Sequence, residues 1–70
     1  MNYMVDINKL YAFYRINVNL SKHAAEVIMS GMDYTKPVVI LDKPQPGLSL
    51  IQQGSFKAVV PDQVLTHVAD

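Results

Sequence analysis

Apolar and polar side chains alternate along residues 10–20. Every even position in this segment is apolar or tyrosine, and the odd positions become polar from Arg15 onward. A period of two puts successive side chains on opposite faces of a β-strand, so the pattern predicts a strand whose even face is buried. That face comprises Leu10, Ala12, Tyr14, Ile16, Val18 and Leu20.

The preceding residues show a similar alternation with the opposite parity. Tyr3, Val5 and Ile7 occupy odd positions, and most of the even positions around them are polar. A hairpin turn at Asn8–Lys9 would account for the change of parity. We therefore expect another strand over residues 2–7.

The same region also fits a helix. Asp6 is a suitable N-cap, because its carboxylate can accept hydrogen bonds from the first free backbone N–H groups. Ile7, Leu10, Tyr11 and Tyr14 then follow at the i, i+3, i+4, i+7 spacing of one helical face. We favour the strand and keep the helix as the alternative.

Several signals agree on a helix from Ser21 to Ser30. Ser21 is a good N-cap, Leu20 and Ala25 can form a hydrophobic staple, and Gly31 suits a left-handed residue after the last turn. Helical periodicity predicts one buried face and one solvated face. The buried face comprises Ala24, Val27 and Ile28, and the solvated face comprises His23, Glu26 and Ser30.

The second half of the chain is expected to form strands and turns. Residues 38–41 are apolar at every position, which is typical of a strand buried on both faces. Turns over 42–47 and 52–55 would connect it to strands over 48–51 and 55–60. Pro61 and Asp62 then open a short terminal helix that carries Val64, Leu65 and Val68.

These elements predict an α+β fold. We expect a small single domain, residues 1–70, in which an antiparallel β-sheet packs against one main helix, followed by a short C-terminal helix. The chain has 70 residues, 50% of them hydrophobic, and no cysteine. A domain this small without a disulfide is expected to be only marginally stable on its own. This predicts stabilisation by a partner, most simply as a homodimer. The apolar segment 38–41 adds to this expectation, because one helix leaves the other face of a sheet open.

Charge and terminal patterns narrow the partners further. Six lysines and arginines balance six aspartates and glutamates, which argues against a nucleic-acid partner. The N-terminus has no signal-peptide or lipidation pattern, and no apolar run is long enough to span a membrane. We therefore expect a cytoplasmic protein with no membrane partner.

Candidate catalytic groups are scattered along the sequence. His23 and Glu26 have a spacing that occurs in metal sites, but one such pair does not make a site. The serines lie outside a nucleophile-elbow motif, and the glycines stand singly, so they form no phosphate-binding loop. We expect no enzyme activity, no catalytic residue, no cofactor and no metal.

The odd face of the predicted strand over 10–20 carries the best functional signal. On a strand its side chains would lie in one continuous row, and aromatic and arginine residues are enriched in the hot spots of protein interfaces. We predict that this row binds a protein. It comprises Tyr11, Phe13, Arg15, Asn17 and Asn19.

The function expected from these features is that of a non-enzymatic protein-binding module, a small inhibitor or adaptor of bacterial or phage type. The alternative is a dimeric DNA-binding regulator. The order of elements, with the segments 37–41 (PVVIL) and 58–61 (AVVP), resembles the dimeric N-terminal domain of Phd-type antitoxins, which implies DNA binding. The chain departs from that family because only Arg15, Lys22 and Lys36 lie near the helix that would face DNA, and no acidic toxin-binding tail follows.

Overall fold

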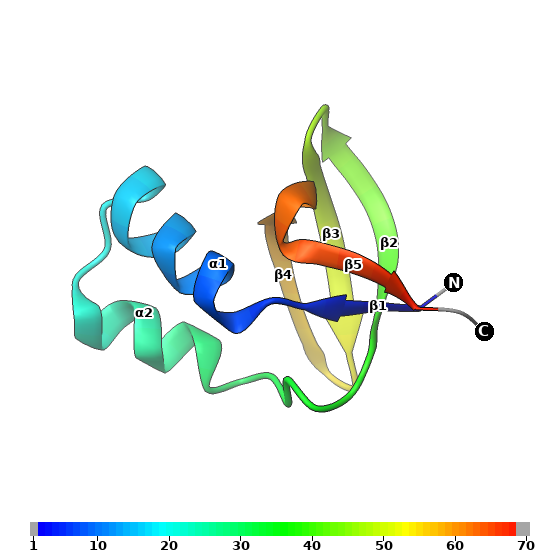
Figure 1. The fold of residues 1–70 in the computed structure, drawn as a ribbon, viewed down its shortest axis with the longest axis horizontal. Coiled ribbons are helices and arrows are strands. Elements are labelled where there is room, and N and C mark those ends of the chain that lie inside the picture. The colour runs from blue at the N-terminus through cyan, green and yellow to red at the C-terminus, as the bar shows by residue number, and fades with distance from the viewer. Residues whose placement is uncertain (1, 69–70) are drawn as a thin grey trace.

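The structure is a computed structural model that describes residues 2–68, and it contains one antiparallel sheet and two helical segments (Figure 1). The five strands lie in the order β4-β3-β2-β1-β5. The α+β class and the antiparallel sheet are therefore confirmed. The elements are β1 (Asn2–Val5), α1 (Ile7–Ala12), the π-helix η1 (Phe13–Asn17), α2 (Lys22–Met29), β2 (Val38–Gln45), β3 (Leu48–Gln53), β4 (Phe56–Pro61), the 3-10 helix η2 (Asp62–Val64) and β5 (Leu65–Val68).

The two helical segments project from one end of the sheet (Figure 1). They connect β1 to β2, and we call residues 7–29 the helical hairpin. The core draws on both parts of the molecule. The helical hairpin contributes Leu10, Tyr14, Ala25 and Met29, and the strands and η2 contribute Val5, Val38, Ile51, Val60 and Val64.

The predicted strand over 10–20 and the hairpin turn at Asn8–Lys9 are wrong, because this region is helical. The Asp6 carboxylate accepts hydrogen bonds from the backbone N–H groups of Asn8 (3.0 Å) and Lys9 (3.1 Å), which stabilises the first turn of α1. Leu10 and Tyr14 are buried one turn apart, as on a helix. The alternative helix interpretation was therefore the correct one.

Of the even-numbered residues beyond Tyr14, Leu20 packs against the core, but Ile16 and Val18 do not. Ile16 is 77% exposed and Val18 is 45% exposed. The helix continues over 13–17 in the wider π form, in which the Val18 N–H reaches the carbonyl of Phe13 (3.1 Å). The alternation of apolar and polar residues in this segment therefore does not correspond to an alternation of buried and exposed side chains.

The helix predicted over 21–30 is confirmed, but its buried face is not the predicted one. The Ser21 hydroxyl accepts a hydrogen bond from the Ala24 N–H (3.2 Å) as expected. The buried residues are Ala25 and Met29, whereas Val27 is 57% exposed. Ala24 is half-buried and Ile28 is exposed, so the buried face is rotated around the helix.

The helix ends without a left-handed glycine. In residues 2–68 the glycines with positive φ are Gly47 and Gly54, which lie in the two strand turns. Gly31 is instead required for close packing, because a Cβ at this position would overlap the ring of Phe56. The close contact of Gly31 with Phe56 thus packs the end of α2 against β4.

Strands β2, β3 and β4 form two successive hairpins, as predicted for the second half of the chain. β2 runs to Gln45, beyond its predicted end, and its register with β3 shifts twice. Val38 is buried, but Val39 and Leu41 are exposed, so the prediction of a strand buried on both faces is wrong. This strand lies inside the sheet, yet one of its faces is open.

The predicted terminal helix is wrong as well. Only 62–64 form a turn of 3-10 helix, and residues 65–68 form β5, which pairs with β1. No side chain caps η2, and the Asp6 N–H donates to the Val64 carbonyl (2.9 Å), which fixes the chain at the start of β5. Backbone pairing with β1 therefore outweighs the local helical pattern.

Candidate functional site

The five residues predicted to bind a protein do not form one row. They lie on α1, on η1 and in the turn that follows, so their side chains are distributed around a helix. Tyr11 and Phe13 are half-buried and the other three residues are exposed. Asn19 is the one non-glycine residue of 2–68 with positive φ (61°), and it turns the chain toward α2.

Tyr11 and Arg15 contact each other along one side of the helix. The Arg15 guanidinium donates a hydrogen bond to the Tyr11 hydroxyl (3.0 Å) and lies 5.8 Å from the centre of its ring. These residues are four positions apart, which places them on neighbouring turns. Phe13 and Asn17 lie on another side, where they line a hollow of about 240 Å³ with Ile16 and other residues.

A larger groove of about 480 Å³ lies between the two helices. Sequence analysis missed it, except for Tyr11, because its residues come from both helices and from the loop after α2. The helix alternative already placed Ile7 and Tyr11 on one face and was the available signal. The groove is lined by Ile7, Asn8 and Tyr11 of α1, by Lys22, Glu26 and Met29 of α2, and by Ser30, Met32 and Tyr34.

The base of the groove is apolar and ordered by one internal hydrogen bond. Met29 and Met32 are buried, and the half-buried Tyr34 donates its hydroxyl to the Met29 carbonyl (2.9 Å). Burial, with a smaller contribution from Tyr14, raises the pKa of Tyr34 to about 12. The phenol therefore stays protonated at neutral pH and acts as a hydrogen-bond donor within the fold.

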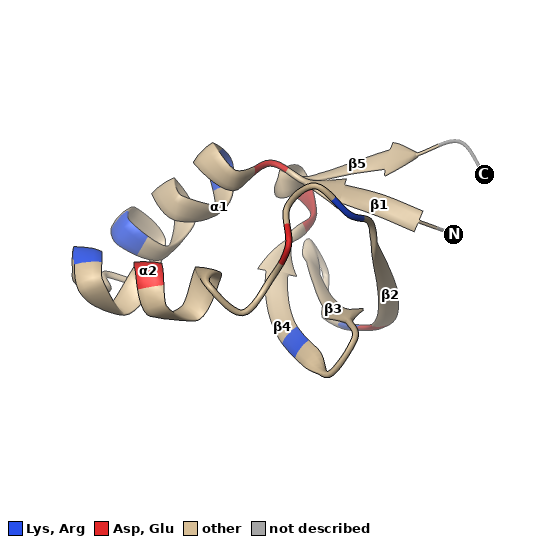
Figure 2. Ribbon diagram, turned by 90° about the horizontal axis from the view of Figure 1, so that it is seen from below, with Lys and Arg blue, Asp and Glu red and all other residues tan. Residues whose placement is uncertain are grey.

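Two opposite charges stand at the edge of the groove. Lys22 and Glu26 are exposed residues of α2, and neither side chain has an ion-pair or hydrogen-bonding partner among residues 2–68. Figure 2 shows a basic and an acidic position on this short helix. A lysine four residues before a glutamate is the less favourable order for pairing within a helix, which agrees with their separation. Both groups are thus available to an external partner.

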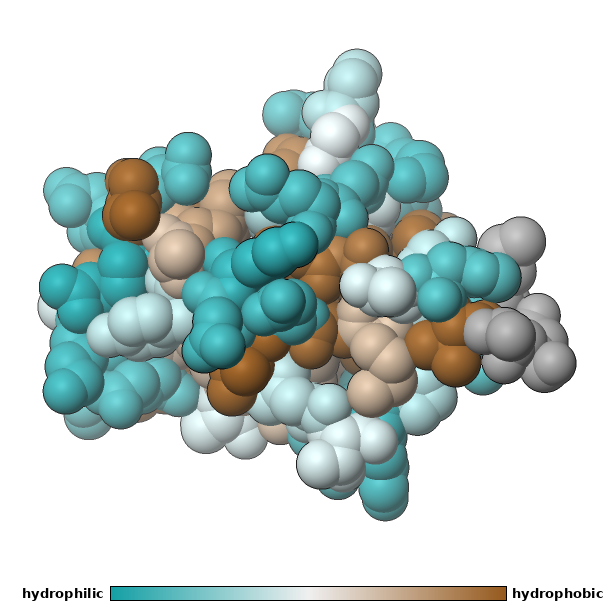
Figure 3. All heavy atoms as spheres, viewed as in Figure 1, coloured by the Kyte–Doolittle hydropathy of each residue, from teal (hydrophilic) through white to brown (hydrophobic). Residues whose placement is uncertain are grey.

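Exposed apolar side chains are concentrated in the helical hairpin. Of the eight exposed large hydrophobic residues in the described range, five belong to this part of the chain. In the view of Figure 3 the helical end shows a brown group set among hydrophilic atoms, and further brown areas lie toward the middle and the right. The five are Ile7, Ile16, Val18, Val27 and Ile28. The other three, Val39, Leu41 and Val59, lie in strands β2 and β4 of the sheet.

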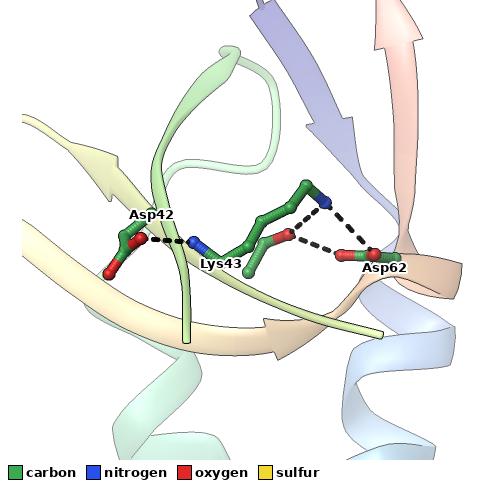
Figure 4. Close-up of polar contacts among 4 residues, drawn as sticks. Asp42, Lys43 and Asp62 are labelled. Atoms are coloured by element: carbon green, nitrogen blue, oxygen red, sulfur yellow. Dashed lines mark hydrogen bonds and ion pairs between the residues drawn. The ribbon is translucent and has the colours of Figure 1, made fainter. Parts of the chain in front are cut away.

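A polar cluster in the sheet contrasts with this surface (Figure 4). The fully buried Ser49 donates its hydroxyl hydrogen to Asp62, and the Lys43 ammonium donates to Ser49 Oγ and to Asp62 Oδ2, both at 3.2 Å. The Ser49 hydrogen bond, together with Lys43, holds the pKa of Asp62 below its usual value. Ser49 is inaccessible, and the lowered pKa of Asp62 makes this carboxylate a weak base. The cluster therefore connects β2, β3 and η2 and does not form an activated nucleophile.

No group of three or more His, Cys, Asp and Glu residues is arranged to hold a metal ion within residues 2–68. No helix in the same range is long and apolar enough to cross a membrane.

Comparisons with protein-family models, with curated proteins and with solved structures found no match for this chain.

Proposed function

We propose that the chain is a protein-binding module, an inhibitor or adaptor, which binds its partner through the groove of the helical hairpin. The observation that carries the proposal is an apolar groove of about 480 Å³ whose charged residues, Lys22 and Glu26, have no partner in residues 2–68. An apolar centre with a polar rim is the usual anatomy of a protein interface. The proposed site retains Tyr11 of the sequence-predicted residues and moves the centre of recognition to the groove.

The groove also offers the side chains that contribute most to interface energies. Tyr11 and Tyr34 provide rigid aromatic surface, and Met29 and Met32 can adapt to the shape of a partner. Arg15 stacks against Tyr11 and so extends this surface along the helix. A partner side chain placed between the helices would touch residues of both.

A different protein is a better candidate for the partner than a second copy of the chain. The accessible surface is 4564 Å², and a folded monomer of this mass is expected to expose about 4,400 Å². The chain therefore buries as much surface as a monomer does, and the core does not require a dimer for completion. A second copy remains an outcome that the experiments must distinguish.

The test compares two charge insertions of matched exposure. Ile7 is 47% exposed in the groove, and Val59 is 43% exposed on the sheet. Ile7 directly follows the N-cap, where glutamate is compatible with the helix dipole, so Ile7→Glu should preserve the fold. Proteins retained by the immobilised wild-type chain should be lost with Ile7→Glu and kept with Val59→Glu.

Two results would contradict the proposal. One is equal retention of every partner by both variants, and the other is retention of no protein by the wild-type chain. Circular dichroism of both variants must match the wild type, because an unfolded variant would lose partners for a trivial reason.

A further inference from the structure

The groove is formed by two helices packed side by side and by the loop after α2, and apart from the free groups of their terminal turns the backbones of the helices are bonded internally. Amide and carbonyl groups inside a helix are already bonded to each other. An extended peptide would bring its own unpaired backbone groups into an apolar groove, and burying them without partners is costly. A helical segment satisfies its backbone internally, so it can enter this groove at no such cost.

The length of α2 limits how much of a partner helix can contact this wall of the groove. The eight residues of α2 extend over about 12 Å, which corresponds to roughly two helical turns. A third helix laid along the groove would contact Ile7 and Tyr11 on the α1 wall and would lie over Met29 at the base. Such a helix needs an apolar stripe at positions i, i+3 or i+4, and i+7.

The charged residues Lys22 and Glu26 at the edge of the groove indicate which charged residues the partner helix should carry beside its apolar stripe. Lys22 and Glu26 are four residues apart on one helix, so their side chains are separated by about one turn. A complementary helix would place an acidic residue opposite Lys22 and a basic residue opposite Glu26. On the partner, too, these residues would be about one turn apart.

We infer that the groove binds an amphipathic helix of a partner protein, with an apolar stripe flanked by one acidic and one basic residue a turn apart. This inference rests on the proposed function and specifies the class of partner. It follows from the helical walls, the apolar base and the unpaired opposite charges.

The experiment uses two displayed libraries of peptides about 14 residues long, a length that gives nearly four helical turns. One library fixes leucines at helical spacing and varies the other positions among helix-forming residues. The second places proline at every third position, which enforces an extended conformation. Both libraries are selected against the full-length chain.

The binders are expected to come from the helical library and to carry an acidic and a basic residue one turn apart. Affinity for the double variant Lys22→Glu/Glu26→Lys should be about tenfold weaker, because two favourable contacts become repulsive. The control Lys57→Glu changes a lysine on β4, away from the groove, and should alter affinity less than twofold. Peptides with the acidic and basic positions exchanged should prefer the double variant.

Enrichment confined to the extended library, helical binders insensitive to the double variant, or no binder from either library would overturn the inference. The proposed function fails separately, by the Ile7→Glu and Val59→Glu comparison. If the chain alone sediments as a dimer and Ile7→Glu converts it to a monomer, a second copy fills the groove and the inference of a foreign helix is wrong.

Discussion

The helical hairpin and the sheet contribute to one core but differ in how they use polar groups. In the sheet, Lys43, Ser49 and Asp62 bond to one another and connect three elements. In the helical hairpin, Lys22 and Glu26 stand beside an apolar groove without partners in the described residues. Lys43, Ser49 and Asp62 thus hold elements of the fold together, while Lys22 and Glu26 are the side chains to which the proposal assigns recognition.

The largest expected effect tests whether the two regions share one core. Leu10 in the helical hairpin and Ile51 in the sheet are almost completely buried, at 1% and 0% exposure. Either residue changed to alanine should lower the free energy of unfolding by about 2–5 kcal/mol, whereas Ile16→Ala should change it by less than about 0.5 kcal/mol. Urea denaturation followed by circular dichroism measures all three.

The same series distinguishes the helix from the strand over 10–20. If Ile16→Ala destabilised the protein as strongly as Leu10→Ala, the even positions would share a buried face and the helical assignment would be wrong. A single transition in all three variants would show that the two regions unfold together.

The parts of the fold that were predictable from the sequence are those set by local chemistry. The Ser21 cap and the strand expected over 55–60, which corresponds to β4, each depend on a few neighbouring residues, and each was predicted. The segment 65–68 was not, because its conformation depends on pairing with β1, about sixty residues earlier in the chain. Local pattern gives no direct information about such a distant partner.

The segment 10–20 shows how a local pattern can mislead. Its alternation predicted a strand, but the cap at Asp6 and the buried pair Leu10 and Tyr14 belong to a helix. The groove was even less predictable from the sequence, because Ile7 and Met32 are brought together by the packing of two helices and the loop after them. Such a site could be inferred only after the helices and their relative placement were known.

A second prediction concerns the contact that joins the two regions at the end of α2. Gly31→Ala would place a Cβ against the ring of Phe56 without any change of φ class, so the cost is steric. We expect a loss of about 1–3 kcal/mol in the free energy of unfolding, as for other overpacked contacts. In a Phe56→Ala background the added methyl group should cost little, and equal costs in both backgrounds would exclude this contact as the cause.

A third prediction concerns the Asp6 N-cap, which precedes the helical hairpin. Asp6→Ala removes the acceptor for the Asn8 and Lys9 N–H groups and should cost about 1 kcal/mol. Asp6→Asn keeps a side-chain oxygen and should recover most of the loss. Denaturant midpoints of the three proteins provide the measurement, and an Asn variant no better than the Ala variant would show that the cap does not stabilise α1.

The smallest expected effect is a pH dependence that belongs to the sheet. Hydrogen bonding from Ser49 and the charge of Lys43 lower the pKa of Asp62, so the folded state binds this proton less readily than the unfolded chain does. The corresponding stabilisation is therefore fully present above the unfolded pKa of about 4 and is lost as pH falls through the lower folded value. The wild-type protein should be more stable than Asp62→Asn at pH 7, and this difference in stability should shrink between about pH 5 and pH 3.

Ser49→Ala removes the hydroxyl that contributes most to the pKa shift of Asp62, so the same difference measured in that background should vary less with pH. A difference between wild type and Asp62→Asn that stayed constant over this range would mean that Asp62 is not stabilised as a carboxylate, and the polar contrast between sheet and helical hairpin would lose its clearest support.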